Sequence, residues 1–360
     1  MARTSVFFLL SLCMLLSLVG TSSAGARKTA NIYELRKGDF SVKVTNWGGV
    51  ILSVVLPDSN GKLGDIVLAY EGIGPYLNDT TYFGALVGRV GNRIAGSRFV
   101  LNGKPYRLFP NNGNNSLHGG HRGFSDVFWT VKKKVDGETP YITLYYHSFD
   151  GEQGFPGDLD VYVTYKLSEN YALSISMVAH PRNKATPVNL IQHTYWNLGG
   201  EGSGTILKDK VQIFASQITP VDEDLIPTGA FKSVKGTPYD FLEPKEVGSE
   251  IESVEGGYDI NYVLDSPADS KGLLRKVAVV ESESSGRKME LWADKPGVQF
   301  YTAGFLEDVK GKNGHVYPQY GGLCLETQGF PDAVNQPKFP SVIVKPGQVY
   351  NHNMVFKFSF

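Results

Sequence analysis

Short runs that alternate between apolar and polar residues constrain the fold of this chain more than any other sequence feature. Alternation with a period of two is typical of half-buried strands. After the first 30 residues no stretch of ten or more shows convincing helical periodicity, and the 41 glycines and 19 prolines fall mostly between the runs. The chain is therefore predicted to be all-β, with strands near residues 41–45, 50–56, 141–146, 159–167, 171–179, 276–280, 298–302, 341–345 and 349–358.

Two pairs of these runs predict hairpins. Residues 159–167 and 171–179 are separated by Ser168-Glu169-Asn170, and residues 341–345 and 349–358 by Pro346-Gly347. No shift of composition and no repeat of fixed period divides the chain, so we expect one large β domain over residues 25–360. The formal net charge of −1, without a Lys/Arg cluster, argues against a nucleic-acid or membrane-surface partner.

The N-terminus has the layout of a secretory signal peptide. Arg3 is its only charge, residues 6–20 are almost all apolar, and small residues lead to Ala24. The apolar run is short for a bilayer span, which disfavours an uncleaved anchor. We expect residues 1–24 to be removed. Because the last four residues show no ER-retention signal, we expect the mature protein to be secreted, without a membrane segment.

Cleavage after Ala24 would remove Cys13 and leave Cys324 as the only cysteine of the mature chain. No intramolecular disulfide could then form. Cys324 lies in the apolar run Leu323-Cys324-Leu325 and is interpreted as a buried packing thiol.

The stretch around this cysteine, GGLCLETQGFPDAVN at residues 321–335, places Glu326 at the end of a short apolar strand. Gly329 and Pro331 then turn the chain into a loop. A carboxylate in this position suits a buried general base. A surface glutamate at a strand end would give the same pattern.

Two glycine-rich stretches carry basic side chains. YFGALVGRVGNRIAGS, from residue 82, contains Arg89 and Arg93, which could donate to sugar hydroxyls or form ion pairs within the fold. NNGNNSLHGGHR, from residue 111, contains His118 and His121. Without a nearby carboxylate or cysteine pair, that spacing is weak evidence for a metal and favours hydrogen bonding or proton transfer.

Two further stretches carry candidate acids. In PVNLIQHTYWNLGG, from residue 187, His193 ends an apolar run and precedes aromatic residues, which suits either a general acid or a satisfied core histidine. In GGYDINYVL, from residue 256, Asp259 could bind a polyol or cap a turn. The candidate arginines, histidines, aspartate and glutamate together fit acid–base chemistry on a polar, uncharged substrate. The sequence lacks nucleotide-binding, serine-hydrolase and metalloprotease motifs, which agrees with this interpretation.

Taken together, the stretches resemble the aldose 1-epimerase (galactose mutarotase) family. The shared motifs are GRVGNRI at Gly88, NNSLHGG at Asn114, QHTYWNL at Gln192, GYDINY at Gly257, GVQFYT at Gly297 and LETQGFPDA at Leu325. They occur in order from about residue 30 to the C-terminus. The resemblance implies a large antiparallel β-sandwich with an open sugar-binding cleft, and catalysis of anomer interconversion without metal or other cofactor.

The resemblance also implies roles for single residues. Glu326 corresponds to the general base and His193 to the general acid of ring opening, and His118 assists at the ring oxygen. Further positions are implied to bind substrate, namely Asn92, Arg93, Thr194, Tyr195, Asp259 and Gln299. The substrate would be a free aldohexose, and we expect a monomer.

Departures from the common pattern are few. Gln192, Trp196 and Gly91 stand where many members carry Asn, Phe and Ala. Ile260 stands where many carry His, and because it neighbours Asp259 we expect it to alter the shape of the sugar pocket.

Three alternative functions are open at this stage. A sugar-phosphate epimerase would need a basic cluster, for which Arg89 and Arg93 are the nearest candidates. A secreted sugar-binding protein could keep the fold with little turnover. A retaining glycosidase would need a second positioned carboxylate, for which Asp259 is the nominal candidate.

Two glycosylation sequons generate the first prediction. Asn114 lies four residues before His118, so a glycan there would crowd the expected cleft, whereas Asn78 is free of this conflict. We expect Asn78 to be the glycosylated site if either is, and peptide mapping of active protein from a eukaryotic secretory host would show it. A glycan on Asn114 in active protein would contradict the placement of the cleft.

Overall fold

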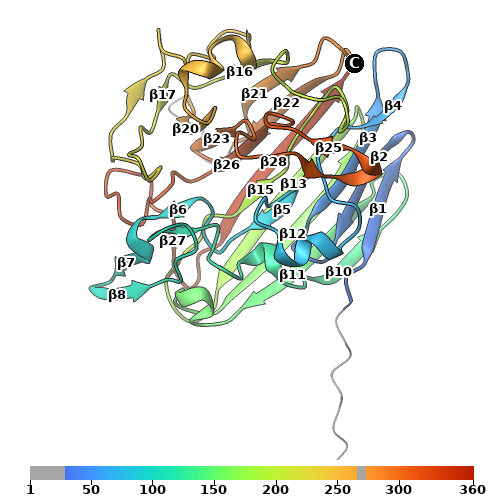
Figure 1. Cartoon of the computed structure of the whole chain (residues 1–360). Helices are drawn as coiled ribbons and strands as arrows, with labels where there is room; N and C mark the ends of the chain where they lie inside the picture. Colours follow the sequence, from blue (N-terminus) through green and yellow to red (C-terminus); the bar gives the residue numbers. More distant parts are fainter. Residues whose placement is uncertain (1–28, 266–272) are drawn as a thin grey trace, which may run out of the picture.

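The computed structural model describes residues 29–265 and 273–360. The predicted signal peptide at residues 1–24, with Cys13, lies outside this part of the chain. The described residues are almost entirely strands and loops, which confirms the all-β fold class (Figure 1). No described helix is long and apolar enough to cross a membrane.

The largest sheet has nine antiparallel strands and forms one layer of the molecule. The predicted hairpin of residues 159–179 is confirmed as β12 and β13, whereas the last strand, β28, lies in the middle of the sheet between β13 and β22 (Figure 1). In spatial order the strands are β10 (Thr130–Val135), β11 (Tyr141–Ser148), β12 (Leu159–Ser168), β13 (Ala172–Pro181), β28 (Tyr350–Ser359), β22 (Lys288–Ala293), β21 (Arg275–Glu281), β16 (Lys210–Ile213) and β19 (Lys245–Glu246).

A five-stranded sheet packs against this layer. Its order is β18 (Lys232–Ser233), β17 (Gln217–Ile218), β20 (Asp259–Val263), β23 (Gly297–Tyr301) and β26 (Cys324–Gln328). Backbone hydrogen bonds between Leu323 and Trp196 continue it to the pair of β15 (Ile191–His193) and β5 (Ala85–Val87). These strands together form the inner layer.

Smaller elements complete the chain. A four-stranded sheet at the N-terminus consists of β1 (Ile32–Lys37), β2 (Phe40–Thr45), β3 (Ile51–Pro57) and β4 (Leu63–Asp65). Two-stranded pairs are β6 (Arg93–Ile94) with β9 (Ser116–Leu117), β7 (Arg98–Leu101) with β8 (Lys104–Arg107), β14 (Thr186–Pro187) with β27 (Ile343–Val344), and β24 (Val309–Lys310) with β25 (Val316–Tyr317). Short 3₁₀ turns are η1 (Gly74–Asn78), η2 (Ala95–Ser97), η3 (Phe124–Asp126), η4 (Glu152–Gly154), η5 (Val247–Ser249), η6 (Ile251–Ser253) and η7 (Lys312–Gly314).

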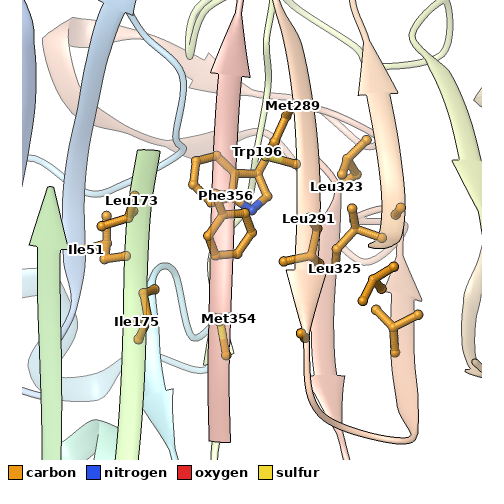
Figure 2. Close-up of a cluster of buried hydrophobic side chains, with 14 of the residues drawn as sticks. Ile51, Leu173, Ile175, Trp196, Met289, Leu291, Leu323, Leu325, Met354 and Phe356 are labelled. Atoms are coloured by element: carbon orange, nitrogen blue, oxygen red, sulfur yellow. The ribbon is translucent and has the colours of Figure 1, made fainter. Parts of the chain in front are cut away.

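The main hydrophobic core lies between the two layers. Trp196, from the inner layer, packs against Phe356 of β28 with ring centroids 4.9 Å apart. Figure 2 shows this contact among side chains of the large sheet and the inner layer, including Leu173, Ile175, Met289, Leu291, Leu323, Leu325 and Met354. Burial of such side chains is worth roughly 1.5–3 kcal/mol each, so the core holds the inner layer in place.

Strand alternation gives the inner layer two different faces. Leu323, just before β26, and Leu325, on β26, point to the core, so Cys324 and Glu326 point to the opposite face. On β23, Val298 and Phe300 belong to the core, and Gln299 shares the face of Glu326, to which it is directly paired. The core thereby fixes the direction of the polar side chains on the other face.

Two local predictions were wrong. The runs near 341–345 and 349–358 do not pair with each other, because β27 pairs with β14 and β28 joins the large sheet. The Pro346-Gly347 turn itself forms, closed by a hydrogen bond from Gln348 N–H to Lys345 O. Glu326 does not end its strand, because β26 continues to Gln328 and all its residues are buried.

Candidate active site

A polar cavity of about 550 Å³ opens on the face of the inner layer that points away from the core. Residues from both predicted histidine stretches and from β20, β23 and β26 line it, so segments distant in the sequence meet there. The lining comprises Thr80, Thr81, Tyr82, Asn92, Arg93, Asn112, Gly113, Leu117, His118, His193, Tyr195, Glu223, Asp224, Leu225, Asp259, Gln299, Tyr301, Phe305, Leu306 and Glu326.

Glu326 and His193 face each other at the floor of this cavity. His193 Nε2 lies 3.6 Å from Glu326 Oε1, and both side chains are at least 95% buried. Glu326 Oε2 has no hydrogen-bond partner among the described residues. Because the Glu326 carboxyl group and the His193 imidazole both line the cavity, a single bound molecule could contact both.

Burial shifts the pKa values of these two groups in opposite directions. Loss of water, reinforced by the nearby Asp259 carboxylate and opposed by Arg93, raises the pKa of Glu326 well above its ordinary value. Loss of water lowers the pKa of His193 to about 4. Burial therefore disfavours both the carboxylate of Glu326 and the imidazolium of His193, and favours the uncharged pair that holds its proton on Glu326.

His118 presents a proton donor to the cavity. The Asn92 N–H donates to His118 Nδ1 at 3.2 Å, so Nδ1 is unprotonated and the neutral ring carries its proton on Nε2. The His118 N–H in turn donates to Asn92 O at 3.0 Å, which fixes the two loops to each other. Burial, with further contributions from His193 and Arg93, lowers the pKa of His118 well below its ordinary value, so the ring is neutral.

The three groups also form the only set among the described residues that could hold a metal ion. Ligand atoms of His118, His193 and Glu326 lie within 4.8 Å of one another. A metal on His118 Nε2 would need the lone pair of the nitrogen that carries the proton, and moving this proton to Nδ1 would break the bond from Asn92. This hydrogen-bond pattern fits a proton donor better than a ligand. His121 is exposed and does not line the cavity.

A polar network surrounds the pair. Arg93 Nη1 lies 3.7 Å from Asp259 Oδ2, and Arg93 Nε donates to Asn112 Oδ1 at 3.2 Å. Gln299 Nε2 donates to Asp259 Oδ1 at 2.6 Å. Hydrogen-bonding groups held in fixed directions in this way can recognise several hydroxyls of one polyol.

Most of the predicted site residues meet in this cavity, but Thr194 and Arg89 do not. Thr194 lies on the core side of the strand end, where its hydroxyl accepts from Gln192 Nε2 at 3.2 Å. Arg89 is 2% exposed and donates to Pro156 O, Gly157 O and Thr186 Oγ1 at 2.8, 2.8 and 3.0 Å. Its role is to tie loops together, and Arg93 alone of the two arginines lines the cavity.

Ile260 does not shape the pocket, contrary to expectation. It follows Asp259 on β20, so its side chain points to the opposite face and belongs to the main core. Of the other departures, Trp196 is a core residue, and Gln192 is bonded to Gly84 O and to the Tyr165 hydroxyl. A Cβ on Gly91 would lie 2.2 Å from Ile191 Cδ1, so alanine there would force Ile191 to move.

Cys324 is fully buried, as predicted, and lies behind the catalytic candidates. Its Sγ is 3.7 Å from His193 Nδ1, on the side of the ring away from Glu326. Burial raises the pKa of the thiol well above its ordinary value, which agrees with a packing role.

Several residues that line the cavity were not predicted from the sequence. Tyr82 packs against both histidine rings, with centroids 4.6 Å from His118 and 5.9 Å from His193. Tyr301 could have been found, because it lies two positions after Gln299 on the same face of one strand. The loop with Glu223, Asp224 and Leu225 has no sequence motif that predicts a site, because its position beside the cavity depends on tertiary structure.

Solved structures identify the class of fold. A crystal structure of an aldose epimerase homologue from C. elegans matches with a TM-score of 0.84 and 30% identity, covering 92% of this chain and 99% of the other. A galactose 1-epimerase from Lactobacillus acidophilus matches with a TM-score of 0.77 over 92% of this chain and 99% of the other, and at 22% identity it supports the fold alone. The chain has the β-sandwich of these proteins.

Sequence relatives identify the family. The model of the aldose 1-epimerase family matches residues 31–357. The galactose mutarotase of Mus musculus is 44% identical over 333 residues, which cover 92% of this chain and 94% of the mouse protein. The aldose 1-epimerase of Escherichia coli K12 is 33% identical over 324 residues, covering 88% and 91%. The chain belongs to the aldose 1-epimerase family.

The buried carboxyl group generates a stability prediction. Because the folded-state pKa of Glu326 exceeds its ordinary value of 4.5, the wild-type protein loses stability as pH rises above that value toward the folded pKa. Glu326→Gln cannot ionise and escapes this loss. Denaturant unfolding at about pH 4 and about pH 7.5 should therefore show a larger gain in the unfolding free energy of the variant at the higher pH.

The exposed Glu138→Gln serves as the control for this experiment and should show no such pH-dependent gain. A stability difference between Glu326→Gln and wild type that is equal at both pH values would contradict the raised pKa.

Proposed function

We propose that this protein is an aldose 1-epimerase that interconverts the α and β anomers of free hexoses such as galactose and glucose. The observation that carries the proposal is the buried pair of Glu326 Oε1 and His193 Nε2, 3.6 Å apart at the floor of a polar cavity. Family membership supports it, since sequence relatives of the chain are named galactose mutarotase and aldose 1-epimerase.

The reaction requires two proton transfers in opposite directions. Glu326, as carboxylate, takes the proton of the anomeric hydroxyl, and His193, as imidazolium, protonates the ring oxygen, so that the C1–O5 bond breaks and an aldehyde forms. The pair then holds its one proton on Glu326, which is the arrangement that burial favours. Rotation about C1–C2 and reclosure with the reverse transfers give the other anomer.

The neighbouring groups support these steps. The Nε2–H of His118 can donate to the ring oxygen or to an adjacent hydroxyl. Asn92, Arg93, Asp259 and Gln299 bind the remaining hydroxyls, and Tyr195 and Tyr82 pack beside His193. These contacts hold the sugar while C1 rotates, so binding and chemistry use different side chains.

The charges of the cavity favour a free sugar over a sugar phosphate. Among the described residues, its lining contains one guanidinium, that of Arg93, and four carboxyl groups, those of Glu223, Asp224, Asp259 and Glu326. Arg89, the second basic residue expected near the site, is occupied by backbone carbonyls elsewhere. A phosphate would need several cationic donors and meets mostly negative groups here.

Secretion remains part of the proposal and rests on sequence alone. The layout of residues 1–24 supports entry into the secretory pathway. Asn114, the sequon beside the cleft, is exposed and directly follows the lining residues Asn112 and Gly113, which supports Asn78 as the glycosylated site. A monomer is likewise proposed.

Polarimetry tests the activity. Freshly dissolved α-D-galactose and α-D-glucose should relax to equilibrium faster with wild-type protein, and Glu326→Gln or His193→Asn should lower the enzymatic rate by about 10²–10⁴-fold, because each removes one proton-transfer group. His121→Asn, an exposed loop histidine, is the matched control and should keep the rate. Sugar binding without acceleration by folded wild-type protein would favour the sugar-binding alternative.

The paired pKa shifts predict the pH profile of kcat/KM. Activity requires that Glu326 and His193 share one proton, so the enzymatic rate should be flat between the lowered pKa of His193 and the raised pKa of Glu326. It should fall below about pH 4, where His193 gains a second proton. It should fall again at higher pH, as the pair loses its proton above the raised pKa of Glu326. Rates corrected for spontaneous mutarotation would show both limbs, and an acid limb near pH 6.5, the ordinary value for histidine, would contradict burial of His193.

A further inference from the structure

The mouth of the cavity is acidic, and no step of the proposed chemistry uses this property. We call the exposed lining residues the lip: Thr80, Gly113, Glu223, Asp224 and Phe305. Neither Glu223 nor Asp224 forms an ion pair among the described residues. Two uncompensated carboxylates therefore stand where a sugar enters.

Hydrogen bonds fix the backbone of the loop that carries these two residues. Asp222 Oδ1 accepts the N–H groups of Asp224 and Ile226, both at 3.0 Å, and Asp222 O accepts the N–H of Leu225 at 3.0 Å. Thr228 N–H also donates to Pro220 O at 2.9 Å and closes the base of the loop. The acidic pair is thus presented by a hydrogen-bonded loop whose tip is fixed by its own side chain.

The interior does not offset this negative charge. Among the residues that the structure describes, Arg93 is the only lysine or arginine in the lining, and its Nη1 lies 3.7 Å from Asp259 Oδ2. The floor carries Glu326, which is 2% exposed and has an Oε2 atom without a partner among the described residues. A ligand therefore meets carboxylates at the lip and the Glu326 carboxyl group at the floor.

We propose that Glu223 and Asp224 act as a charge filter, so that the site selects uncharged and amino-substituted aldoses and rejects aldoses that carry a carboxylate. A cleft with one sign of charge and low-dielectric walls concentrates the field and changes the local concentration of charged ligands. The inference rests on the proposed function, because it specifies the substrate class of the same cavity. It assigns to the lip a role in selection and none in proton transfer.

Competition experiments test the filter. Equilibrated galactosamine, protonated at the working pH, and equilibrated galacturonate would each be used as inhibitors of galactose mutarotation. In wild type we expect galactosamine to inhibit at lower concentration than galacturonate. In Glu223→Gln/Asp224→Asn the ratio of the two inhibition constants should shift by about five- to fiftyfold in favour of galacturonate, as expected for removal of two nearby charges.

The control variant removes two glutamates from hairpin turns of the large sheet, Glu138→Gln/Glu169→Gln. Both residues are exposed and absent from the lining, so the net charge changes equally while the ratio should stay as in wild type. Raising the salt concentration from about 0.01 M to about 0.5 M should reduce the wild-type preference, because exposed charges are screened.

Either of two results would overturn the charge filter. One is a ratio of the two inhibition constants that is the same in the Glu223/Asp224 variant as in wild type. Failure of galacturonate to inhibit either protein counts as the same negative result. The other is an equal shift in the control variant, which would indicate net charge rather than the lip. Failure of the proposed function would appear separately, as no acceleration of galactose mutarotation by wild-type protein.

Discussion

Removal of the Glu326 carboxyl group from water is the constraint on which the rest of the site depends. The group stands in the middle of β26, whose other face carries Leu325 into the main core. The strand therefore cannot turn the carboxyl group toward solvent without losing that packing. Burial raises its pKa and keeps a proton near the imidazole of His193. The hydrophobic core thus sets the protonation of a polar site on the far side of one sheet.

Strand alternation explains why so few strands supply so much of the chemistry. Asp259, Gln299 and Glu326 come from three adjacent strands and share one face. The histidines come from elsewhere: His193 ends β15, and His118 is held by its reciprocal bonds with Asn92. Hydroxyl binding is therefore built on a rigid sheet, whereas one of the two imidazoles depends on contact between loops.

The sequence predicted the parts of this arrangement that depend on local pattern. Period-2 runs located the long strands, and motif resemblance located Glu326, His193, His118 and Arg93. Prediction from sequence failed where tertiary contacts decide the direction of a side chain or the pairing of a strand. Ile260 neighbours Asp259 in sequence but faces the core. The sequence also could not tell which of Arg89 and Arg93 lines the cavity, because the buried carbonyl partners of Arg89 are known only from the structure. The partner of β28 was also unpredictable, because β13 lies far away in sequence.

The central position of β28 has a consequence for how the chain is made. Because β28 fills the place between β13 and β22, the nine-stranded sheet cannot close until residues 350–359 have left the ribosome. Until then β13 and β22 each lack a neighbour, and their open edges can pair with other chains. Premature termination shortly before β28 would thus leave two unpaired edges in the nascent protein, and such chains would be prone to aggregation and would need protection by chaperones.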